Sequence, residues 1–177
     1  MNAVIRQSPA ERASTPVDVY LQPGQYFVGD ARYQLRTLLG SCVSITLWHP
    51  GLRVGAMSHF LLASRARGPH QALDGRYGEE VLELMLSALA RRGVRPEQCQ
   101  AKIFGGGNMF PDRASGPATI DIGRRNGEAA RALLRARGIP VYAEHLFGAG
   151  HRQMVFHIGT GEVWVRQVQP ACGGSRR

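Results

Sequence analysis

The chain has 177 residues, of which 44% are hydrophobic and 20% are charged. This balance is typical of a globular domain and excludes a disordered chain, and the length is enough for one domain with a buried core. The net charge of +9 comes from 22 lysines and arginines against 13 acids. It favours an acidic partner without choosing between nucleic acid, a membrane surface and an acidic protein.

The first sixteen residues, MNAVIRQSPAERASTP, contain no apolar segment of the kind found in secretion signals. No apolar run reaches the length of about 18 residues that spans a bilayer. The three cysteines, Cys42, Cys99 and Cys172, form neither a disulfide pattern nor a CxxC zinc motif. We therefore expect a cytoplasmic protein with no membrane insertion, no metal and no cofactor.

The first part of the chain predicts strands, because β-branched and apolar runs alternate with turn residues. These runs cover 17–29 in two pieces around a Pro-Gly turn, then 34–39, 43–48 and 53–62. The segment that follows, ASRARGPHQALDG, has no apolar period and predicts a mobile loop.

Two helices and four more strands are predicted in the remainder. Leucine and methionine side chains recur at i, i+3, i+4 and i+7 between Glu79 and Arg92, which indicates an amphipathic helix. A second helix is predicted over 124–137, where Gly-Ile-Pro follows as a stop signal. The strands are predicted at 101–106, 141–147, 153–159 and 162–168, and Gly-Thr-Gly joins the last two as a hairpin.

This order of elements predicts an α/β fold rich in strands: a mixed, largely antiparallel sheet system with two main helices packed on it. We expect one catalytic domain over 17–169, between a flexible N-terminus over 1–16 and a flexible tail over 170–177. The segment FGGGNMF (104–110) lacks the lysine and spacing of a Walker loop and is not GxGxxG. It predicts either a close approach of the backbone to a ligand or only a tight turn at the end of a strand.

Cys42 stands at the entrance to the buried-looking run VSITLW, where it is either a packing residue or a nucleophile. A thiol needs a base to ionise near neutral pH, and histidine is the usual one. Of the six histidines, His59 lies in the next predicted strand. A turn at 50–51 would place it opposite Cys42, with Cβ atoms about 4.5–5.5 Å apart. We therefore predict that His59 is the partner of Cys42, while structural roles for both remain the alternative.

Four segments, TLLGSCV, GAMSHFLL, AKIFGGGNMF and IGRRNGEAAR, occur in this order and together resemble the CheD family of chemoreceptor glutamine deamidases. The resemblance covers about residues 20–168 and implies a CheD-like cysteine hydrolase sandwich. It implies that Cys42 is the nucleophile and His59 its catalytic partner. It further implies a substrate pocket that is formed with Ser41, Gly106, Gly107 and Asn126.

The chain departs from the family pattern at the third catalytic residue. That residue is a threonine six positions before the cysteine, where this chain has Arg36; the threonine here is Thr37. A shift by one residue turns a side chain to the opposite face of a strand. Either a β-bulge returns Thr37 to the site or its hydroxyl is dispensable, so Thr37 is a candidate catalytic residue.

The resemblance also implies the chemistry. The Cys42 thiolate attacks the side-chain amide carbon of a receptor glutamine, His59 protonates the departing ammonia, and water then hydrolyses the thioester to glutamate. We expect the backbone N–H groups around Ser41–Val43 to stabilise the oxyanion. We also expect the pKa of Cys42 to lie well below the value of about 8.5 for a free thiol.

The partners implied by the resemblance are the acidic cytoplasmic domains of chemoreceptors and a CheC-type phosphatase, and the same thioester would serve to hydrolyse glutamate methyl esters. Two alternatives fit the sequence less closely. A basic nucleic-acid-binding module would explain the charge, but aromatic residues make up only 7% and no RNP-like or GXXG motif occurs, so we expect no nucleic-acid partner. A cysteine amidase or thioesterase acting on small molecules would share Cys42 and His59 but not the substrate.

Overall fold

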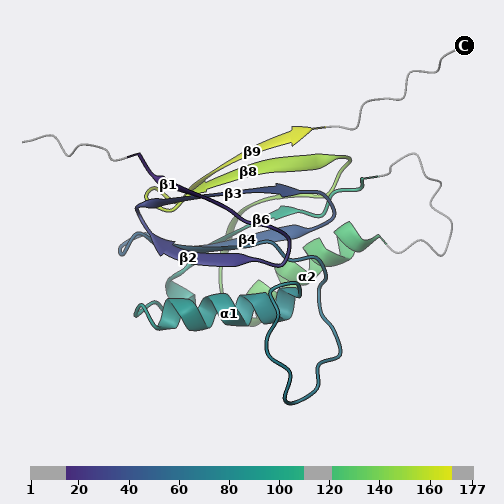
Figure 1. Cartoon of the computed structure of the whole chain (residues 1–177), viewed down its shortest axis with the longest axis horizontal. Helices are drawn as coiled ribbons and strands as arrows, with labels where there is room; N and C mark the ends of the chain where they lie inside the picture. Colours follow the sequence, from purple (N-terminus) through teal and green to yellow (C-terminus); the bar gives the residue numbers. More distant parts are fainter. Residues whose placement is uncertain (1–14, 110–120, 169–177) are drawn as a thin grey trace, which may run out of the picture.

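The computed structural model describes residues 15–109 and 121–168. Two β-sheets lie face to face, and both α-helices lie on the outer side of the second sheet (Figure 1). This mixed arrangement confirms the predicted α/β fold. The predicted flexible tail over 170–177 lies outside the described residues, as does the predicted N-terminus over 1–16 except for its last two positions.

The first sheet has four strands in the order β1-β3-β8-β9. Strand β1 runs parallel to β3, and the other neighbours are antiparallel. The predicted hairpin around Gly-Thr-Gly is confirmed, because β8 and β9 pair along their whole length. The strands are β1 (Val17–Tyr20), β3 (Tyr33–Leu39), β8 (His151–His157) and β9 (Glu162–Val168).

The second sheet has five strands in the order β2-β5-β4-β6-β7, and only β6 and β7 are parallel. The two sheets together are therefore largely antiparallel, as predicted. The two strands predicted on either side of the Pro-Gly turn belong to different sheets. The strands are β2 (Tyr26–Asp30), β5 (Val54–Ser58), β4 (Val43–His49), β6 (Gln100–Gly105) and β7 (Val141–Leu146).

Strand β5 is shorter than predicted, because the chain leaves the ladder after Ser58. The N–H of His59 donates to the carbonyl of Gln25 at 2.9 Å, and the N–H of Leu61 donates to that of Arg76 at 2.9 Å. These bonds to other segments interrupt the ladder, and after Ser58 only an isolated pairing of Phe60 with Val43 remains of it among the described residues. The predicted strand over 53–62 is therefore wrong in its second half.

The helices begin and end close to the predicted residues. Helix α1 (Gly78–Ala90) packs its apolar stripe on the second sheet, and α2 (Ile122–Ala136) lies beside it. Asp121 caps α2, since its carboxylate accepts from the N–H of Arg124 at 2.9 Å. A single turn of 3-10 helix, η1 (Pro96–Gln98), precedes β6. No helix in the described residues has the length and apolar character of a membrane span.

The layers enclose two hydrophobic cores. One lies between the helices and the second sheet, and the other lies between the two sheets. Alternate residues of β4 contribute to each: Val43 belongs to the first core, while Cys42 and Trp48 pack against the second. The side chain of Cys42 therefore faces the layer between the sheets, at the end where β3 passes into β4.

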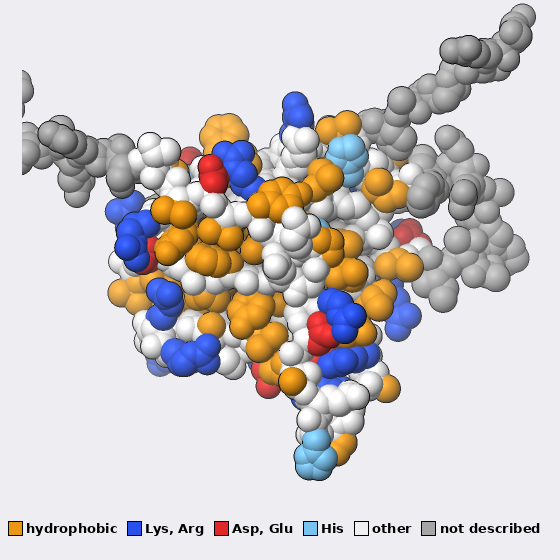
Figure 2. Space-filling view, viewed as in Figure 1, with side chains coloured by type: hydrophobic (Ala, Val, Ile, Leu, Met, Phe, Trp, Pro, Cys, Tyr) orange, Lys and Arg blue, Asp and Glu red, His pale blue; other side chains and the backbone are white. Residues whose placement is uncertain are grey.

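The loop before α1 extends away from the body of the protein (Figure 1). Its base is held by Glu80, which is 6% exposed and accepts from Arg65 Nε at 2.7 Å and from the N–H of Asp74 at 2.7 Å. The bond to Arg65 keeps the pKa of Glu80 below its ordinary value. On the face shown in Figure 2, the basic side chains lie in several separate groups.

Candidate active site

His59 and Thr37 meet between the two sheets. His59 Nδ1 lies 2.8 Å from Thr37 Oγ1, and this hydroxyl donates to the carbonyl of Leu21 at 2.8 Å. A threonine hydroxyl has one proton, so once it donates to Leu21 it can only accept from the imidazole. His59 Nδ1 therefore carries the proton, and Nε2 carries the lone pair with which a histidine acts as a base.

Thr37 reaches the imidazole without a β-bulge. Strand β3 alternates regularly, with Thr37 buried and Arg36 exposed, and its pairing with β8 shows no shift of register. The chain leaves the first sheet after Leu39 and enters the second at Val43. The rule that neighbours point to opposite faces holds within one strand and does not relate Thr37 to the cysteine in the next sheet.

Cys42 does not stand directly opposite His59, so the predicted register is wrong by two residues. The loop of the hairpin is longer than predicted, because His49 is the residue that faces Val54. At the other end of the ladder Val43 faces Phe60. Cys42 is consequently a diagonal neighbour of His59.

A diagonal neighbour still lies within reach of a long side chain, at about 7–8 Å between residues. Cys42 and His59 both face the layer between the sheets. Cys42 is partly exposed, whereas His59 is 3% exposed. His59 Nε2 is the atom that would take the thiol proton. Within the described residues it has no hydrogen-bond partner, so its lone pair is available.

Burial disfavours charge on both groups. It raises the pKa of the Cys42 thiol above its ordinary value and lowers the pKa of His59 below 6.5. The expected low-pKa thiolate is therefore wrong for the protein without substrate: thiol and imidazole are both neutral. His59 must then act as a general base that takes the thiol proton when the sulfur attacks.

The glycine-rich segment lies directly behind the turn that carries Cys42. Gly106 N–H donates to the carbonyl of Cys42 at 2.9 Å, and Gly107 N–H donates to that of Gly40 at 2.8 Å. A Cβ at Gly106 would lie 2.6 Å from the carbonyl of Gly123, so only glycine permits this approach. The close backbone approach at this segment is made to the protein's own chain, and it fixes the position of the turn that carries Cys42.

Asn126 connects the two segments that carry the predicted catalytic residues. It is 1% exposed, and its side-chain N–H groups donate to the carbonyls of Ser41 at 3.1 Å and Leu61 at 2.7 Å. Ser41 precedes Cys42, and Leu61 follows His59 by two residues. The amide thus holds both segments at a fixed separation. The predicted role of Asn126 in binding substrate stays a prediction.

Replacing Asn126 with alanine should lower the free energy of unfolding by about 2 kcal/mol, because two buried carbonyls lose their donors. Chemical denaturation measures this change. Arg125→Ala is the matched control, since the neighbouring side chain is exposed and should change stability by less than about 0.5 kcal/mol. Equal stabilities for the two variants would mean that Asn126 does not connect the segments.

Replacing Thr37 with valine should lower turnover about 100-fold, because the imidazole loses the acceptor that fixes its tautomer and orientation. Arg36→Gln is the control: Arg36 is exposed and pairs with Asp18 at 2.7 Å on the outer face of the first sheet. Its turnover should match that of the wild type. Steady-state ammonia release measures both, and equal rates in the two variants would remove Thr37 from the site.

The main-chain N–H groups near Cys42 differ in whether they are free to bind an oxyanion. The N–H of Val43 already donates to the carbonyl of Phe60 at 3.1 Å, so it is not available for an oxyanion. Within the described residues the N–H groups of Ser41 and Cys42 donate to no other backbone carbonyl. These two groups are the remaining candidates in the predicted range.

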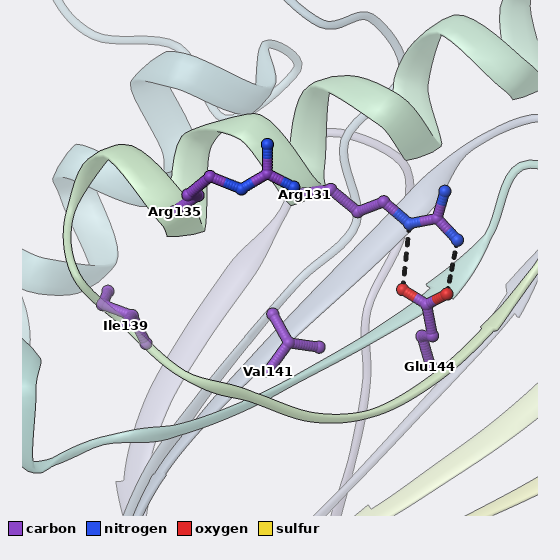
Figure 3. A pocket seen from close by; sticks show the side chains of 5 residues that line it. All are labelled: Arg131, Arg135, Ile139, Val141 and Glu144. Atoms are coloured by element: carbon purple, nitrogen blue, oxygen red, sulfur yellow. Dashed lines mark hydrogen bonds and ion pairs between the residues drawn. The ribbon is translucent and has the colours of Figure 1, made fainter.

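The surface hollows in the described part of the protein include one beside α2 and one beside β1 and β2. One has a volume of about 360 Å³ and lies between α2 and the edge strand β7, where Arg131 pairs with Glu144 (Figure 3). None of the predicted site residues lines it. The second, of about 540 Å³, is lined by residues 19–21 and 24–27, among them Leu21. Because the carbonyl of Leu21 binds Thr37, this second hollow borders the histidine side of the site.

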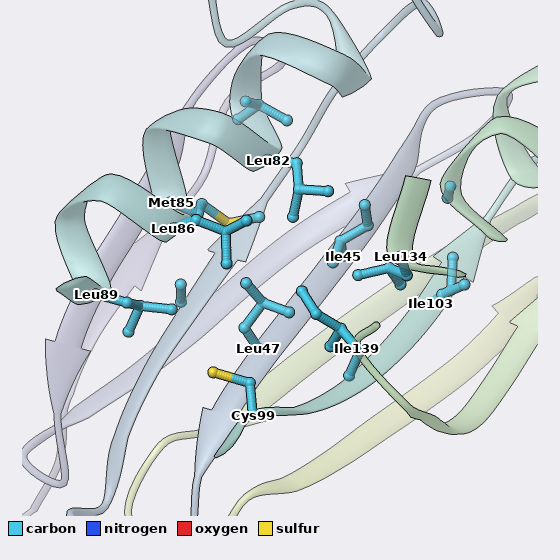
Figure 4. Packing of buried hydrophobic residues seen from close by; sticks show 14 of the residues in the cluster. Ile45, Leu47, Leu82, Met85, Leu86, Leu89, Cys99, Ile103, Leu134 and Ile139 are labelled. Atoms are coloured by element: carbon cyan, nitrogen blue, oxygen red, sulfur yellow. The ribbon is translucent and has the colours of Figure 1, made fainter. Parts of the chain in front are cut away.

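Cys99 has a different setting from Cys42. It is 1% exposed in the core beneath the helices, among Leu47 and Leu89 (Figure 4). Burial raises its pKa to about 11, so it stays a thiol. Cys172 lies outside the described residues. The described residues contain no group of three or more histidine, cysteine or acidic side chains arranged to hold a metal ion.

The sequence did not indicate the carbonyl of Leu21 as part of the site. Any residue supplies a backbone carbonyl, so no side chain could have marked this position. The burial of Ser44 and Thr46 was not predicted either, although a signal existed: both alternate with apolar residues in β4. Polar side chains on the buried face of a strand require partners or a function.

Comparison with known proteins identifies relatives over most of the chain. The family model described as CheD chemotactic sensory transduction matches residues 61–167. A protein of Albidiferax ferrireducens, "Probable chemoreceptor glutamine deamidase CheD 2", is 61% identical over 160 residues, which are 90% of this chain and 92% of the relative. "Probable chemoreceptor glutamine deamidase CheD 3" of Dechloromonas aromatica is 46% identical over 87% of this chain and 89% of its own.

A third relative, "Probable chemoreceptor glutamine deamidase CheD" of Pseudomonas savastanoi pv. phaseolicola, is 42% identical over 86% of this chain and 88% of its own. Among solved structures, YlmD from Geobacillus stearothermophilus aligns with 70% of this chain and 51% of its own, at a TM-score of 0.43 and 16% identity. The family match extends over more than half of the chain, and the relatives match nearly all of it. This chain therefore belongs to the CheD family.

Proposed function

We propose that this protein deamidates glutamine side chains of chemoreceptors to glutamate, in the cytoplasm, through a thioester on Cys42. The observation that carries the proposal is the Thr37–His59 pair, which leaves a lone pair on His59 Nε2, on the same inter-sheet layer that the half-buried thiol of Cys42 faces. Relatives up to 61% identical are named chemoreceptor glutamine deamidases. Their names favour this function over a nucleic-acid-binding module or an enzyme for small molecules.

The first half of the reaction forms the thioester. Cys42 Sγ gives its proton to His59 Nε2 and attacks the carbon of the glutamine amide, whose oxygen becomes negatively charged. The N–H groups of Ser41 and Cys42 stabilise that oxygen. The protonated His59 then gives its proton to the amide nitrogen, the C–N bond breaks, and ammonia leaves.

The second half regenerates the enzyme by hydrolysis. A water molecule gives a proton to His59 Nε2 and attacks the thioester carbon, the C–S bond breaks, and the product is glutamate. Thr37 stabilises the imidazolium in both halves, because its hydroxyl oxygen accepts a hydrogen bond from the Nδ1–H group of His59. Gly106, Gly107 and Asn126 hold the turn that carries Ser41 and Cys42 in place during both steps.

The partner we propose is the cytoplasmic domain of a chemoreceptor. The net charge of +9 would steer the protein toward an acidic surface. Arg124 and Arg125 are exposed directly before Asn126, so two cations lie close to the turn that carries Cys42. A CheC-type phosphatase is the second partner that we propose, on the ground of family membership.

The direct test uses a purified chemoreceptor cytoplasmic domain with its glutamines intact. We expect release of ammonia, together with the mass increase that replacement of an amide by a carboxyl group produces at particular glutamines. Free glutamine and a short glutamine peptide are the controls. Turnover of these small substrates without turnover of the receptor domain would favour the small-molecule amidase, and release of no ammonia from any of them would exclude the proposed reaction.

A further inference from the structure

Ser44 is a buried polar residue that the mechanism above does not use. It lies on β4, it is 0% exposed, and its Oγ has no hydrogen-bond partner among the described residues. His59 Nε2 is also buried and has no partner in the same ranges of the chain. Unpaired buried polar atoms are rare in folded proteins, because each has given up its bonds to water. Two of them in one place suggest a shared role.

The two atoms belong to facing residues. The β4–β5 ladder is in register on both sides of this point, which places Ser44 across from His59. The pairs that fix the register are Val43–Phe60 and Thr46–Met57. Ser44 also shares its face of β4 with Cys42, two residues earlier, so all three side chains border the same region between the sheets.

The strand pairing is irregular beside Ser44 and His59. At the next pair along, Ile45 and Ser58, the Ser58 hydroxyl accepts from the N–H of Ile45 at 3.1 Å in place of a backbone carbonyl. On the other side, the backbones of Val43 and Phe60 exchange bonds at 3.1 and 2.9 Å. Side chains that face each other directly have Cβ atoms about 4.5–5.5 Å apart. One water molecule bonded to both polar atoms would give each of them a partner.

We propose that Ser44 positions the water that hydrolyses the Cys42 thioester, an inference that rests on the proposed function. The water donates one hydrogen bond to Ser44 Oγ and the other to His59 Nε2. As its oxygen bonds to the thioester carbon, His59 takes one proton and the C–S bond breaks. The sulfur leaves as a thiolate and regains a proton from His59. The carboxylic acid formed on the substrate releases its remaining proton to solvent.

Replacing Ser44 with alanine separates this role from a structural one. The variant keeps Cys42, His59 and Thr37, so we expect the thioester to form at the wild-type rate. Hydrolysis should slow about 10-fold or more, because the water loses one of its two anchors. A thioester-linked conjugate of the protein and a purified receptor cytoplasmic domain should then accumulate. Acid quenching, a denaturing gel and cleavage of the conjugate by hydroxylamine detect it.

Thr46→Val is the matched control. Thr46 lies on the same face of β4 and is 1% exposed, and its hydroxyl is 3.5 Å from the carbonyl of Lys102. We expect no conjugate and wild-type turnover in this variant. Ser44→Ala should unfold at a temperature no lower than the wild type, since it removes an unpaired polar atom.

Two results would overturn the role of Ser44. One is unchanged steady-state ammonia release in Ser44→Ala, and the other is an equal slowing of the initial burst and of the steady state with no conjugate. Each of these results counts against Ser44 only when the wild-type protein deamidates the receptor domain in the same assay. A wild type that releases no ammonia would instead reject the proposed function, and the inference with it.

Discussion

Replacing Cys42 with alanine should abolish the release of ammonia from a chemoreceptor cytoplasmic domain while leaving the fold intact. Only the sulfur is lost, and it lies partly exposed at the end of the inter-sheet core rather than within it. Without a nucleophile no thioester forms, and His59 and the backbone donors alone cannot replace a covalent step. The rate of ammonia release should fall at least about 1,000-fold, so that the assay no longer distinguishes it from uncatalysed hydrolysis. Ammonia release and thermal unfolding measure the two properties.

Cys99→Ala is the control for this variant. Its sulfur is buried in the other core, where it packs against the helices, so its loss should cost about 1 kcal/mol of stability and leave turnover unchanged. The two cysteines thus predict opposite results: activity lost with stability kept, and activity kept with stability reduced. Residual deamidation by Cys42→Ala at more than a trace would assign the nucleophile to another residue.

The sequence predicted the elements well where a single periodic signal decides them. The helices are of this kind, since Leu82, Met85, Leu86 and Leu89 form a stripe at helical spacing and all four are buried against the sheet. The hairpin of β8 and β9 is another, because Gly-Thr-Gly is a local turn signal. Local patterns do not show which sheet a strand joins, so the division of β1 and β2 between the sheets was not predictable.

The errors at the site have the same origin. The register of Cys42 against His59 depends on the length of the hairpin loop, and Arg53 adopts a positive φ of 50° that a general turn signal does not reveal. The offset of Thr37 would require a bulge only if Thr37 and Cys42 belonged to one strand, whereas Thr37 lies in β3 and Cys42 directly precedes β4 in the other sheet. The expected low pKa of Cys42 failed because burial, which raises it, is a property of the folded protein.

Replacing His59 with glutamine should lower turnover about 1,000-fold, because the thiol is neutral in the free protein and depends on a base to lose its proton. The dependence on pH tests this role. Burial lowers the pKa of His59 below 6.5, so the wild type should keep its activity as the pH falls to 6.5 and lose it only at lower pH, when Nε2 becomes protonated. In His59→Gln this acid limb should disappear, and the remaining rate should rise only at high pH, with the thiolate fraction of Cys42, because burial holds the pKa of this thiol above its ordinary value.

Stability should report the same titration without any substrate. The unfolded chain binds a proton at His59 near pH 6.5, whereas the folded protein resists it. This contribution to the free energy of unfolding is therefore complete above pH 6.5 and is lost as the pH falls through the lower pKa of the folded state. His59→Gln should therefore lose less stability on acidification than the control His49→Gln. The imidazole that the control removes lies at a turn, where it accepts a hydrogen bond from the N–H of Leu52.

The turnover of His59→Gln decides the assignment of the base. If its turnover falls at low pH as that of the wild type does, another histidine is the base, and the bond between Thr37 and His59 serves only the fold.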